Sequence, residues 1–377
     1  MKVTHIITRL GKGGTDNNVL HFVDWQRRHG HDPRLVVGES SDTTIVPPWL
    51  PVEVAGGLVR DPAPGADLRA LRNLRAIVAR HEPDVVHTHQ SKAGVLGRLA
   101  AVRRAPVIVH TVHMASFGPS YGRSSPAFRA GELVCARITD LVVPVGEGLR
   151  RRYLQSGIGR AGQYCVVRSP VRLTAFLGAR ELDAGRRRQV RAELGLEPSL
   201  PLLLSVGFLE RRKRHDLLLR SLRPLLASGR ATLVVAGDGA RRPARERLAT
   251  DLEVTEAVRF LGHVDPVEEL FAVADVLVHT SAVEGVPQVV LQALAAGVPV
   301  VATETEGLDE VPGAPVRVVD RSGAGLRQAV EDTLADPPPP VAAERLAAWS
   351  DEAVEQQIAA LHSRIEARLG RARGARS

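Results

Sequence analysis

Short runs of β-branched and other apolar residues alternate with helix-like stretches along almost the whole chain, and this alternation limits the fold most. It predicts parallel sheets covered by helices. The runs form two successive series, which predicts two doubly wound α/β domains rather than one barrel, because a barrel needs eight evenly spaced β/α units without a restart. The strands are predicted at 3–8, 34–38, 84–88, 107–111, 141–145 and 164–167, and then at 202–206, 232–236, 258–261, 276–279, 298–302 and 316–319.

The join between the two series is predicted near Ser169 and Pro170. The N-terminal domain then covers 1–170 and the C-terminal domain 171–350, with an arginine-rich helical connector at 179–194. Pro337 to Pro340 break the chain. One or two helices follow, to about Leu369, and the tail from Gly370 is predicted to be disordered. These last elements form a third segment, 351–377.

The composition fits a globular protein with about two domains, since 44% of the 377 residues are hydrophobic and 24% are charged. No run of eighteen apolar residues occurs, so a membrane-spanning helix is not expected. The first ten residues contain interrupting polar residues and do not read as a signal peptide. Cys135 and Cys165 fit neither a disulfide framework nor a metal site, and we interpret them as buried thiols of a cytoplasmic protein.

Positive charge is concentrated in the N-terminal half. Residues 1–170 contain 23 Lys and Arg against 13 Asp and Glu, a net charge of +10, whereas the remaining residues have a net charge of −2. One hypothesis is attraction to an anionic acceptor or to an acidic membrane, so that the protein lies at the inner face of the membrane. The alternative is an arginine-rich chain from a GC-rich genome. Nucleic acid is not an expected partner, because aromatic residues make up only 3% and no binding motif occurs.

The segment 279–303 carries the most chemical information. A strand runs into a loop that contains the carboxylate Glu284, and a helix follows at about 288–296. The first-turn amides of a helix have no partner within it, so they can bind hydroxyl or phosphate oxygens. Gln292 lies eight residues after Glu284 and can point toward the same crevice. This arrangement suits a nucleotide sugar, and the expected donor-binding residues here are Glu284, Gly285, Val286, Pro287, Gln288, Val289 and Gln292.

This segment resembles the donor-site signature of glycosyltransferase family 4, retaining enzymes of the GT-B fold. The family pattern is a Glu, seven residues, and a second Glu. Here Glu284 matches the first, which contacts the sugar in the family, and Gln292 replaces the second, which holds the ribose hydroxyls. A Gln can still donate to and accept from a ribose diol, without the strength of a charged partner. The resemblance extends over nearly the whole chain, with each motif in the expected order.

Three motifs in the N-terminal half follow predicted strands. The loop with Gly13, Gly14 and Asp16 resembles the family's Gly-Gly-x-Glu loop near the donor diphosphate. The run 84–89 resembles the D-V-V-H-x-H segment; we interpret His87 as a core residue, and for His89, Ser91 and Lys92 a core or an acceptor-side role stays open. His113 matches the family's active-site histidine, which binds the donor sugar. The acceptor-side candidates are therefore Asp16, His89, Ser91 and Lys92.

In the C-terminal half, the strand 202–206 leads into a basic turn. The family places an Arg and a Lys on the diphosphate here; Lys213 matches the Lys, whereas Phe208 occupies the arginine position. Arg212 is a candidate to supply the missing charge, together with Arg211 or Arg214. The remaining donor-side candidates are Gly237, in a turn that is chiefly structural in the family, and His263 and Val264, which match the segment whose backbone holds the nucleobase.

The resemblance implies two Rossmann-like domains that enclose a cleft, with a C-terminal helix crossing back onto the first domain. It implies retaining transfer of a sugar from a UDP- or GDP-linked donor to a glycan, lipid-linked or small-metabolite acceptor. Glu284 and His113 would orient the sugar, and Lys213 would stabilise the leaving diphosphate. No Asp-x-Asp motif ends a strand, so neither a metal nor a cofactor is expected beyond the donor itself. The alternatives are a pseudo-glycosyltransferase, a nucleotide-sugar epimerase and a non-catalytic nucleotide-binding relative.

Overall fold

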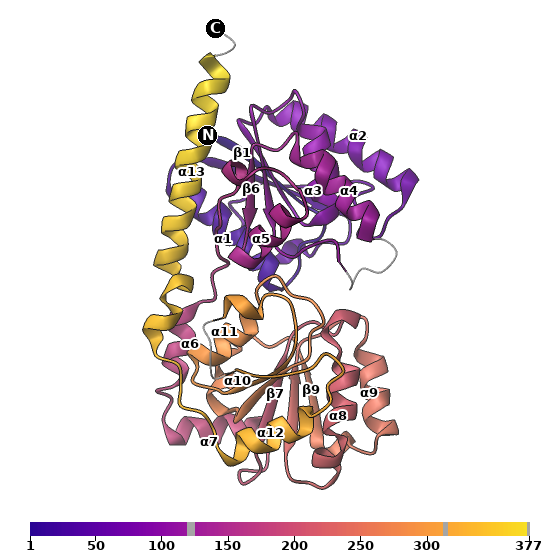
Figure 1. Cartoon of the computed structure of the whole chain (residues 1–377), viewed down its shortest axis with the longest axis vertical. Helices are drawn as coiled ribbons and strands as arrows, with labels where there is room; N and C mark the ends of the chain where they lie inside the picture. The colour runs from indigo at the N-terminus through magenta and orange to yellow at the C-terminus, as the bar shows by residue number, and fades with distance from the viewer. Residues whose placement is uncertain (119–124, 312–315, 375–377) are drawn as a thin grey trace. The chain divides into compact units, whose positions relative to one another are not determined.

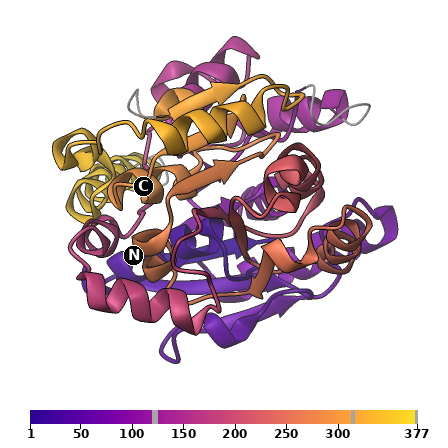
Figure 2. The same cartoon turned by 90° about the horizontal axis from the view of Figure 1, so that it is seen from below.

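The chain divides into two compact units in a computed structural model that describes residues 1–118, 125–311 and 316–374 (Figure 1). Unit 1 comprises Met1–Pro170 together with Glu352–Ser377, and unit 2 comprises Val171–Asp351. Each unit is built on one six-stranded parallel sheet. Helices lie against both faces of each sheet (Figures 1 and 2). The structure therefore confirms the predicted pair of doubly wound domains.

The sheet of unit 1 has the strand order β3-β2-β1-β4-β5-β6. The order reverses between β1 and β4, and in open parallel sheets ligands bind outside the carboxyl ends of the strands at such a reversal. The strands are β1 (Lys2–Ile7), β2 (Asp32–Gly38), β3 (Val52–Ala55), β4 (Val85–His89), β5 (Val107–Val112) and β6 (Leu141–Pro144). The helices are α1 (Gly14–Arg28), α2 (Pro64–His81), α3 (Ser91–Ala101), α4 (Ser125–Ala136), α5 (Glu147–Gln155) and α13 (Asp351–Gly374).

Alternation along these strands supplies two separate cores, because successive side chains point to opposite faces of a sheet. On one face Val3, Val85 and Val109 pack against α1 and α13. On the other face Ile6 and Val86 pack against α2 and α3. The buried residues of α13 recur at helical spacing and form one apolar stripe: Val354, Ile358, Leu361, Ile365 and Leu369. The last helix thus returns to the N-terminal sheet, as the resemblance implied.

The sheet of unit 2 has the order β12-β11-β10-β7-β8-β9, which reverses between β7 and β10. Its strands are β7 (Leu202–Val206), β8 (Thr232–Ala236), β9 (Val258–Gly262), β10 (Val276–His279), β11 (Val300–Thr303) and β12 (Val316–Val319). Its helices are α6 (Leu173–Ala179), α7 (Ala184–Glu193), α8 (His215–Ala227), α9 (Arg242–Asp251), α10 (Glu268–Val273), α11 (Gln288–Ala295) and α12 (Leu326–Ala335).

Alternation also separates the two cores of unit 2. Leu202 and Leu204 face α6, α10 and α11, and Leu203 faces α8 and α12. Short 3-10 turns complete the two units: η1 (Thr43–Ile45), η3 (Ala161–Gln163), η4 (Arg211–Lys213), η5 (Thr255–Ala257), η6 (Leu308–Glu310) and η7 (Ala343–Trp349).

The structure differs from the predicted elements in four places. β3 was not predicted; it is a four-residue strand at the sheet edge, directly after Pro51. The predicted strand at 164–167 is wrong, because this segment makes one isolated bridge beside β6, at Tyr164. The connector predicted at 179–194 is helical only from Ala184 to Glu193, as α7, whose N-terminus the Asp183 side chain caps; α6 precedes it. The C-terminal helix continues to Gly374, so the tail predicted from Gly370 is largely helical; 375–377 lie outside the described residues.

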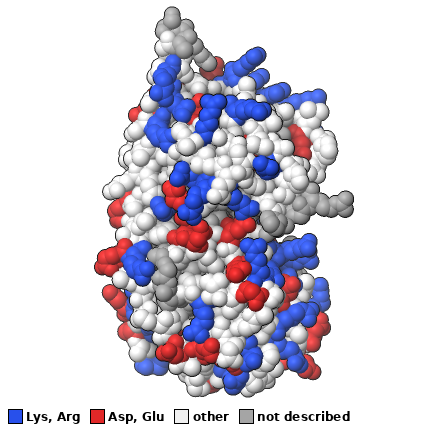
Figure 3. Space-filling view, in the orientation of Figure 1, with Lys and Arg blue, Asp and Glu red and all other residues white. Residues whose placement is uncertain are grey.

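The basic excess belongs to unit 1. Residues 1–170 have a net charge of +10, and the C-terminal segment 352–377 adds 5 Lys and Arg and only 3 Asp and Glu. Figure 3 shows Lys and Arg side chains gathered over this unit on the visible face. Of the helices in the described parts of the chain, none combines the length and apolar character that crossing a membrane requires.

Candidate functional site

The reversal of strand order in unit 2 brings together two loops that the sequence analysis had singled out separately. β7 and β10 are neighbours, with Leu203 opposite Val276 and Leu204 opposite Leu277. β7 leads into the turn of η4, which carries Arg212 and Lys213, and β10 leads into the loop with Glu284. Because both strands run in the same direction, the two loops leave the same edge of the sheet.

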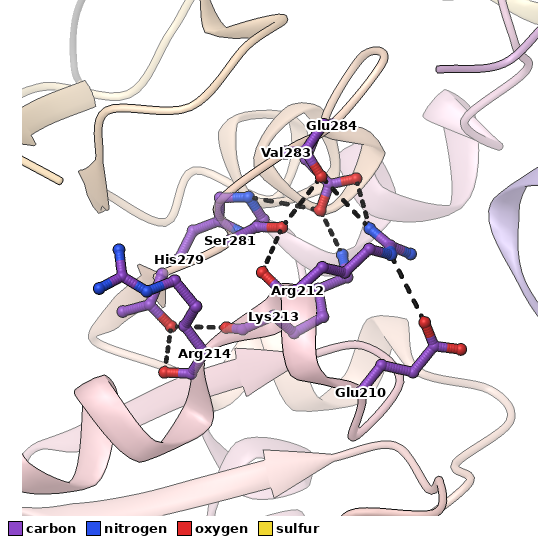
Figure 4. A network of polar contacts seen from close by, with 9 residues as sticks. Glu210, Arg212, Lys213, Arg214, His279, Ser281, Val283 and Glu284 are labelled. Atoms are coloured by element: carbon purple, nitrogen blue, oxygen red, sulfur yellow. Dashed lines mark hydrogen bonds and ion pairs between the residues drawn. The ribbon is translucent and has the colours of Figure 1, made fainter. Parts of the chain in front are cut away.

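Hydrogen bonds join the two loops directly. The backbone N–H of Ala282 donates to the carbonyl oxygen of Arg212 at 2.8 Å. The Thr280 hydroxyl donates to the carbonyl oxygen of Lys213 at 2.9 Å. The backbones are therefore fixed relative to each other, and Glu284 and Lys213 point toward one another (Figure 4).

Glu284 accepts hydrogen bonds from two cations. Lys213 Nζ donates to Oε1 at 2.6 Å, and Arg212 donates to Oε2 at 3.1 Å. His279, the last residue of β10, lies near the same carboxylate, with its Nε2 3.9 Å from Oε1 of Glu284. Glu210 in turn lies 3.6 Å from Arg212. Sequence reasoning missed His279; its place as the final residue of a strand at the reversal is the signal that could have identified it.

The carboxylate at the centre of this cluster is buried, and the two cations on it are half-buried. Glu284 is 8% exposed. Burial alone would raise the pKa of its carboxyl group, but the nearby charges of Lys213 and Arg212 outweigh burial and hold that pKa well below its ordinary value. Burial lowers the pKa of Lys213, and Glu284 opposes that shift. Burial lowers the pKa of His279 to about 3, with a smaller contribution from Lys213, so this ring is neutral at neutral pH.

Lys213 keeps donors for a ligand. Its ammonium has three N–H groups, and within the described residues its side chain donates only to Glu284. The neighbouring turn is held in place by glycines. Gly207 has φ +146°, and a Cβ there would lie 3.2 Å from Cε of Lys213. A Cβ on Gly237 would lie 2.1 Å from the carbonyl oxygen of Gly207, so Gly237 allows close backbone packing.

The other donor-side candidates lie on segments that follow strands of the same sheet. Gly285 to Pro287 connect Glu284 to the N-terminus of α11, whose first turn contains Gln288 and Val289. Gln292 is half-buried in the second turn of α11, and Phe208 is half-buried in the turn after Gly207. His263 and Val264 directly follow β9, where His263 is exposed. The structure thus brings Arg212 and Lys213 onto Glu284, whereas no contact among the described residues joins His263 or Val264 to that carboxylate.

In unit 1 the glycine loop is short, because α1 already begins at Gly14. Gly13 is the N-cap residue, and its N–H donates to the Asp16 carboxylate at 3.0 Å. Asp16 is 6% exposed. Burial raises the pKa of Asp16 to about 6, although hydrogen bonds from Gly11 and Gly13 oppose the shift. In this structure Asp16 therefore caps its own helix.

The strand ends of unit 1 assemble histidines. His113 directly follows β5, is half-buried, and approaches His89, the last residue of β4, with His113 Nε2 3.3 Å from His89 Nδ1. His87 is buried and bonded to the Thr111 hydroxyl at 2.7 Å, as a core residue would be. Ser91 begins α3. Lys92 donates to Asp67 Oδ1 at 2.6 Å, so its charge is used within unit 1.

Three buried imidazoles, His5, His87 and His89, form the one cluster within residues 1–118, 125–311 and 316–374 with the composition of a metal site; their ring nitrogens lie within 4.8 Å of one another. His5 was not a candidate in the sequence analysis. It lies in the middle of β1 and comes beside β4 only because the two strands pair.

Two family models match the chain, one in each unit. The model described as "Glycosyl transferase 4-like domain" matches residues 13–170, and the model described as "Glycosyl transferases group 1" matches residues 200–336. A D-inositol 3-phosphate glycosyltransferase from Geodermatophilus obscurus is 33% identical in an alignment of length 285 that covers 68% of this chain and 61% of that protein. The chain likewise spans 59% and 62% of the length of two other curated relatives that it matches.

Solved structures with the same fold cover nearly the whole chain. The sucrose-phosphate synthase of Thermosynechococcus elongatus superposes with a TM-score of 0.80 at 20% identity, covering 97% of this chain and 99% of that one. The Anabaena protein Alr3699/HepE, crystallised with UDP and glucose, superposes with a TM-score of 0.78 at 20% identity, covering 96% and 99%. At this identity the likeness establishes the GT-B fold.

Proposed function

We propose that this chain, which has the two domains of a GT-B glycosyltransferase, transfers a sugar from a nucleoside-diphosphate sugar to an acceptor hydroxyl. The observation that carries the proposal is the contact of Lys213 and Arg212 with Glu284 at the strand reversal of unit 2. Both flanking loops end at helix N-termini, those of α8 and α11. A cluster of donors at such a place suits a diphosphate and the hydroxyls next to it.

Each residue receives a separate role in this proposal. Lys213 donates to the diphosphate while remaining bonded to Glu284, and it stabilises the negative charge that develops as the diphosphate leaves. Arg212 supplies the second cation, which compensates for Phe208 at the position where the family has arginine. Glu284 accepts from a hydroxyl of the sugar, and His113 of unit 1 is assigned to another sugar hydroxyl. No side chain is required as a covalent nucleophile.

Finer properties follow from the resemblance to family 4 and are part of the same proposal. The transfer retains the anomeric configuration, proceeds without a metal ion, and uses a UDP- or GDP-linked donor. UDP is supported by the Anabaena protein crystallised with that nucleotide. The acceptor is a glycan, a lipid-linked intermediate or a small metabolite. The basic surface of unit 1 supports an anionic acceptor or attachment to the inner face of the membrane.

Mass spectrometry of donor turnover tests this function. The protein is incubated with UDP- and GDP-sugars and mixed acceptors, in EDTA, and free nucleoside diphosphate and glycosylated product are measured together. We expect product with the wild-type protein and a loss of at least about tenfold with Glu284→Ala, since one charge-assisted hydrogen bond contributes about 1.5–3 kcal/mol.

Two controls separate the alternatives. Incubation with the donor alone yields an isomer if the protein is an epimerase, whereas a transferase needs the acceptor. Nucleotide binding without any release of nucleoside diphosphate indicates a non-catalytic relative. Full turnover by Glu284→Ala contradicts the site assignment.

A further inference from the structure

Five buried or half-buried side chains form a continuous hydrogen-bonded chain within unit 1, from α13 to the end of β5. His362 Nε2 lies 3.3 Å from Gln26 Nε2, and Gln26 Oε1 lies 2.8 Å from His5 Nε2. His5 Nδ1 lies 2.9 Å from His89 Nε2. His89 Nδ1 then lies 3.3 Å from Nε2 of His113, the candidate sugar-binding histidine.

The imidazoles of this chain are neutral at neutral pH. His5 and His89 are 0% exposed, and burial lowers the pKa of His5 to about 4, a shift that Gln26 partly opposes. Burial also lowers the pKa of His113 to about 3. A neutral imidazole has one N–H donor and one nitrogen that accepts. His5 and His89 are bonded at both ring nitrogens, so each must donate on one side and accept on the other.

The orientation of the Gln26 amide fixes the direction of the whole series. Its oxygen can only accept, so His5 carries its proton on Nε2 and accepts at Nδ1. His89 then donates from Nε2 and accepts at Nδ1. His113 consequently donates from Nε2 to His89, which leaves Nδ1 of His113 as an acceptor. That nitrogen has no partner among the described residues.

We propose that Gln26 fixes the tautomer of His113 through His5 and His89, so that His113 presents Nδ1 as an acceptor to a hydroxyl of the donor sugar. Gln26, His5 and His89 are positioning residues in this scheme, since none of them has to touch the substrate. That the ligand of His113 is a sugar rests on the proposed function. The tautomer of His113 does not depend on that function. The chain lies wholly within one unit, in its core between the sheet and helices α1 and α13.

The same histidines are better explained by this chain than by a metal site. Both ring nitrogens of His5 and both of His89 are already used in the hydrogen bonds named above. Nε2 of His87 is bonded to the Thr111 hydroxyl. A metal ion would require several of these bonds to break. Divalent-metal binding is therefore an outcome that the test must exclude.

Long-range ¹H–¹⁵N correlation spectra of protein labelled with ¹⁵N-histidine distinguish the two tautomers, and His113→Asn identifies the signals of His113. We expect the wild-type ring to carry its proton on Nε2. Gln26→Met keeps the side-chain length but leaves His5 Nε2–H without an acceptor. If the tautomers of His5, His89 and His113 all reverse, His5 no longer has a proton on Nε2 and this loss is avoided. A measurable share of His113 should then carry its proton on Nδ1. Gln26→Glu restores the wild-type form, because a carboxylate can only accept.

A buried histidine outside the chain serves as the matched control. His110 lies on the opposite face of β5 and is bonded to the Thr88 hydroxyl at 2.9 Å. His110→Asn should leave the His113 tautomer unchanged even if the protein loses stability. The proposal is overturned if wild-type His113 carries its proton on Nδ1, if Gln26→Met leaves the tautomer unchanged, or if the wild-type protein holds a stoichiometric metal ion that His5→Asn removes.

Turnover adds a readout that depends on the proposed function. Loss of one neutral hydrogen bond should lower kcat/KM in Gln26→Met by about threefold to tenfold, with kcat/KM of Gln26→Glu within about twofold of wild type. The spectra need no substrate, so they test whether the hydrogen-bonded chain sets the tautomer of His113 even where no transfer is detected. Equal turnover in Gln26→Met and wild type, with an altered tautomer, would contradict only the role of His113 in sugar binding.

Discussion

At the scale of single residues, Glu284 holds two cations in place within a partly buried cluster. Removing one partner of such a cluster leaves the remaining charges unpaired, which costs more than the loss of the contact itself. Glu284→Gln keeps the side-chain size and removes the charge that Lys213 and Arg212 share. We expect initial rates of transfer at saturating donor to fall by about tenfold to one hundredfold.

Glu246→Gln is the matched control for this change, since Glu246 is an exposed acid paired with Arg242 on α9. It should leave the rate of transfer within about twofold of wild type, because exposed pairs contribute little. Equal losses in both variants would point to general damage to unit 2 and not to a role for Glu284.

Asp16 gives a pH dependence that can be measured at a single residue. Its pKa of about 6 in the folded state lies above the ordinary 3.8. Its favourable contribution is therefore full below pH 3.8 and is lost as pH rises through 6. Asp16→Asn has no such titration, so the free energy of unfolding of the wild type relative to Asp16→Asn should fall by about 2 kcal/mol between pH 4 and pH 7. Urea denaturation at several pH values measures this difference; parallel curves would contradict it.

At the scale of elements, the packing of α13 against the sheet should contribute to the free energy of unfolding of unit 1. Ile358 is 0% exposed and packs against the sheet beside α1. Ile358→Ala should reduce the free energy of unfolding by about 2–5 kcal/mol. Ser363→Ala, on the exposed side of the same helix, should change it by less than about 0.5 kcal/mol. Urea denaturation compares the two, and equal small effects would mean that α13 does not stabilise the sheet.

Elements were predictable from the sequence where the local pattern alone determines them. β7, β8, β10 and β12 begin and end where the sequence places them, because each is an apolar run bounded by turn residues. β3 has no such run, since it lies at an edge and is only partly buried. The segment at 164–167 has the right residues for a strand but lies beside β6 with too few backbone bonds to form one. Local patterns carry no information on pairing at a sheet edge.

The candidate site was predictable where a motif contains its residues, as with Lys213 and Glu284. The hydrogen-bonded chain of unit 1 was not, because His5, Gln26 and His362 lie on β1, α1 and α13 and meet only through tertiary packing. Lys92 shows the opposite case. Its position at the start of a helix after β4 suggested a ligand, whereas its ammonium is bonded to Asp67, a partner that the sequence places elsewhere.

At the scale of the whole molecule, the two units differ in charge. Residues 171–351 contain 22 Lys and Arg against 26 Asp and Glu, so all of the positive excess lies in unit 1. We expect the full-length protein to sediment with vesicles that contain anionic lipid at low salt, and to dissociate at about 0.5 M salt, where charges are screened beyond a few ångströms. Vesicles of neutral lipid are the control. Equal binding to both kinds, or none at low salt, would contradict a role for this charge.

Unit 2 must hold a nucleoside diphosphate at Lys213 for the proposed transfer, and titration calorimetry with UDP and GDP measures this binding directly. We predict binding by the wild-type protein and a Kd at least about tenfold weaker for Lys213→Gln. Arg223→Gln serves as the comparison, because Arg223 is an exposed residue of α8 that is paired with Glu253; its Kd should stay within about twofold of wild type. Undiminished binding by Lys213→Gln, or no binding of either nucleotide by the wild type, would contradict the account.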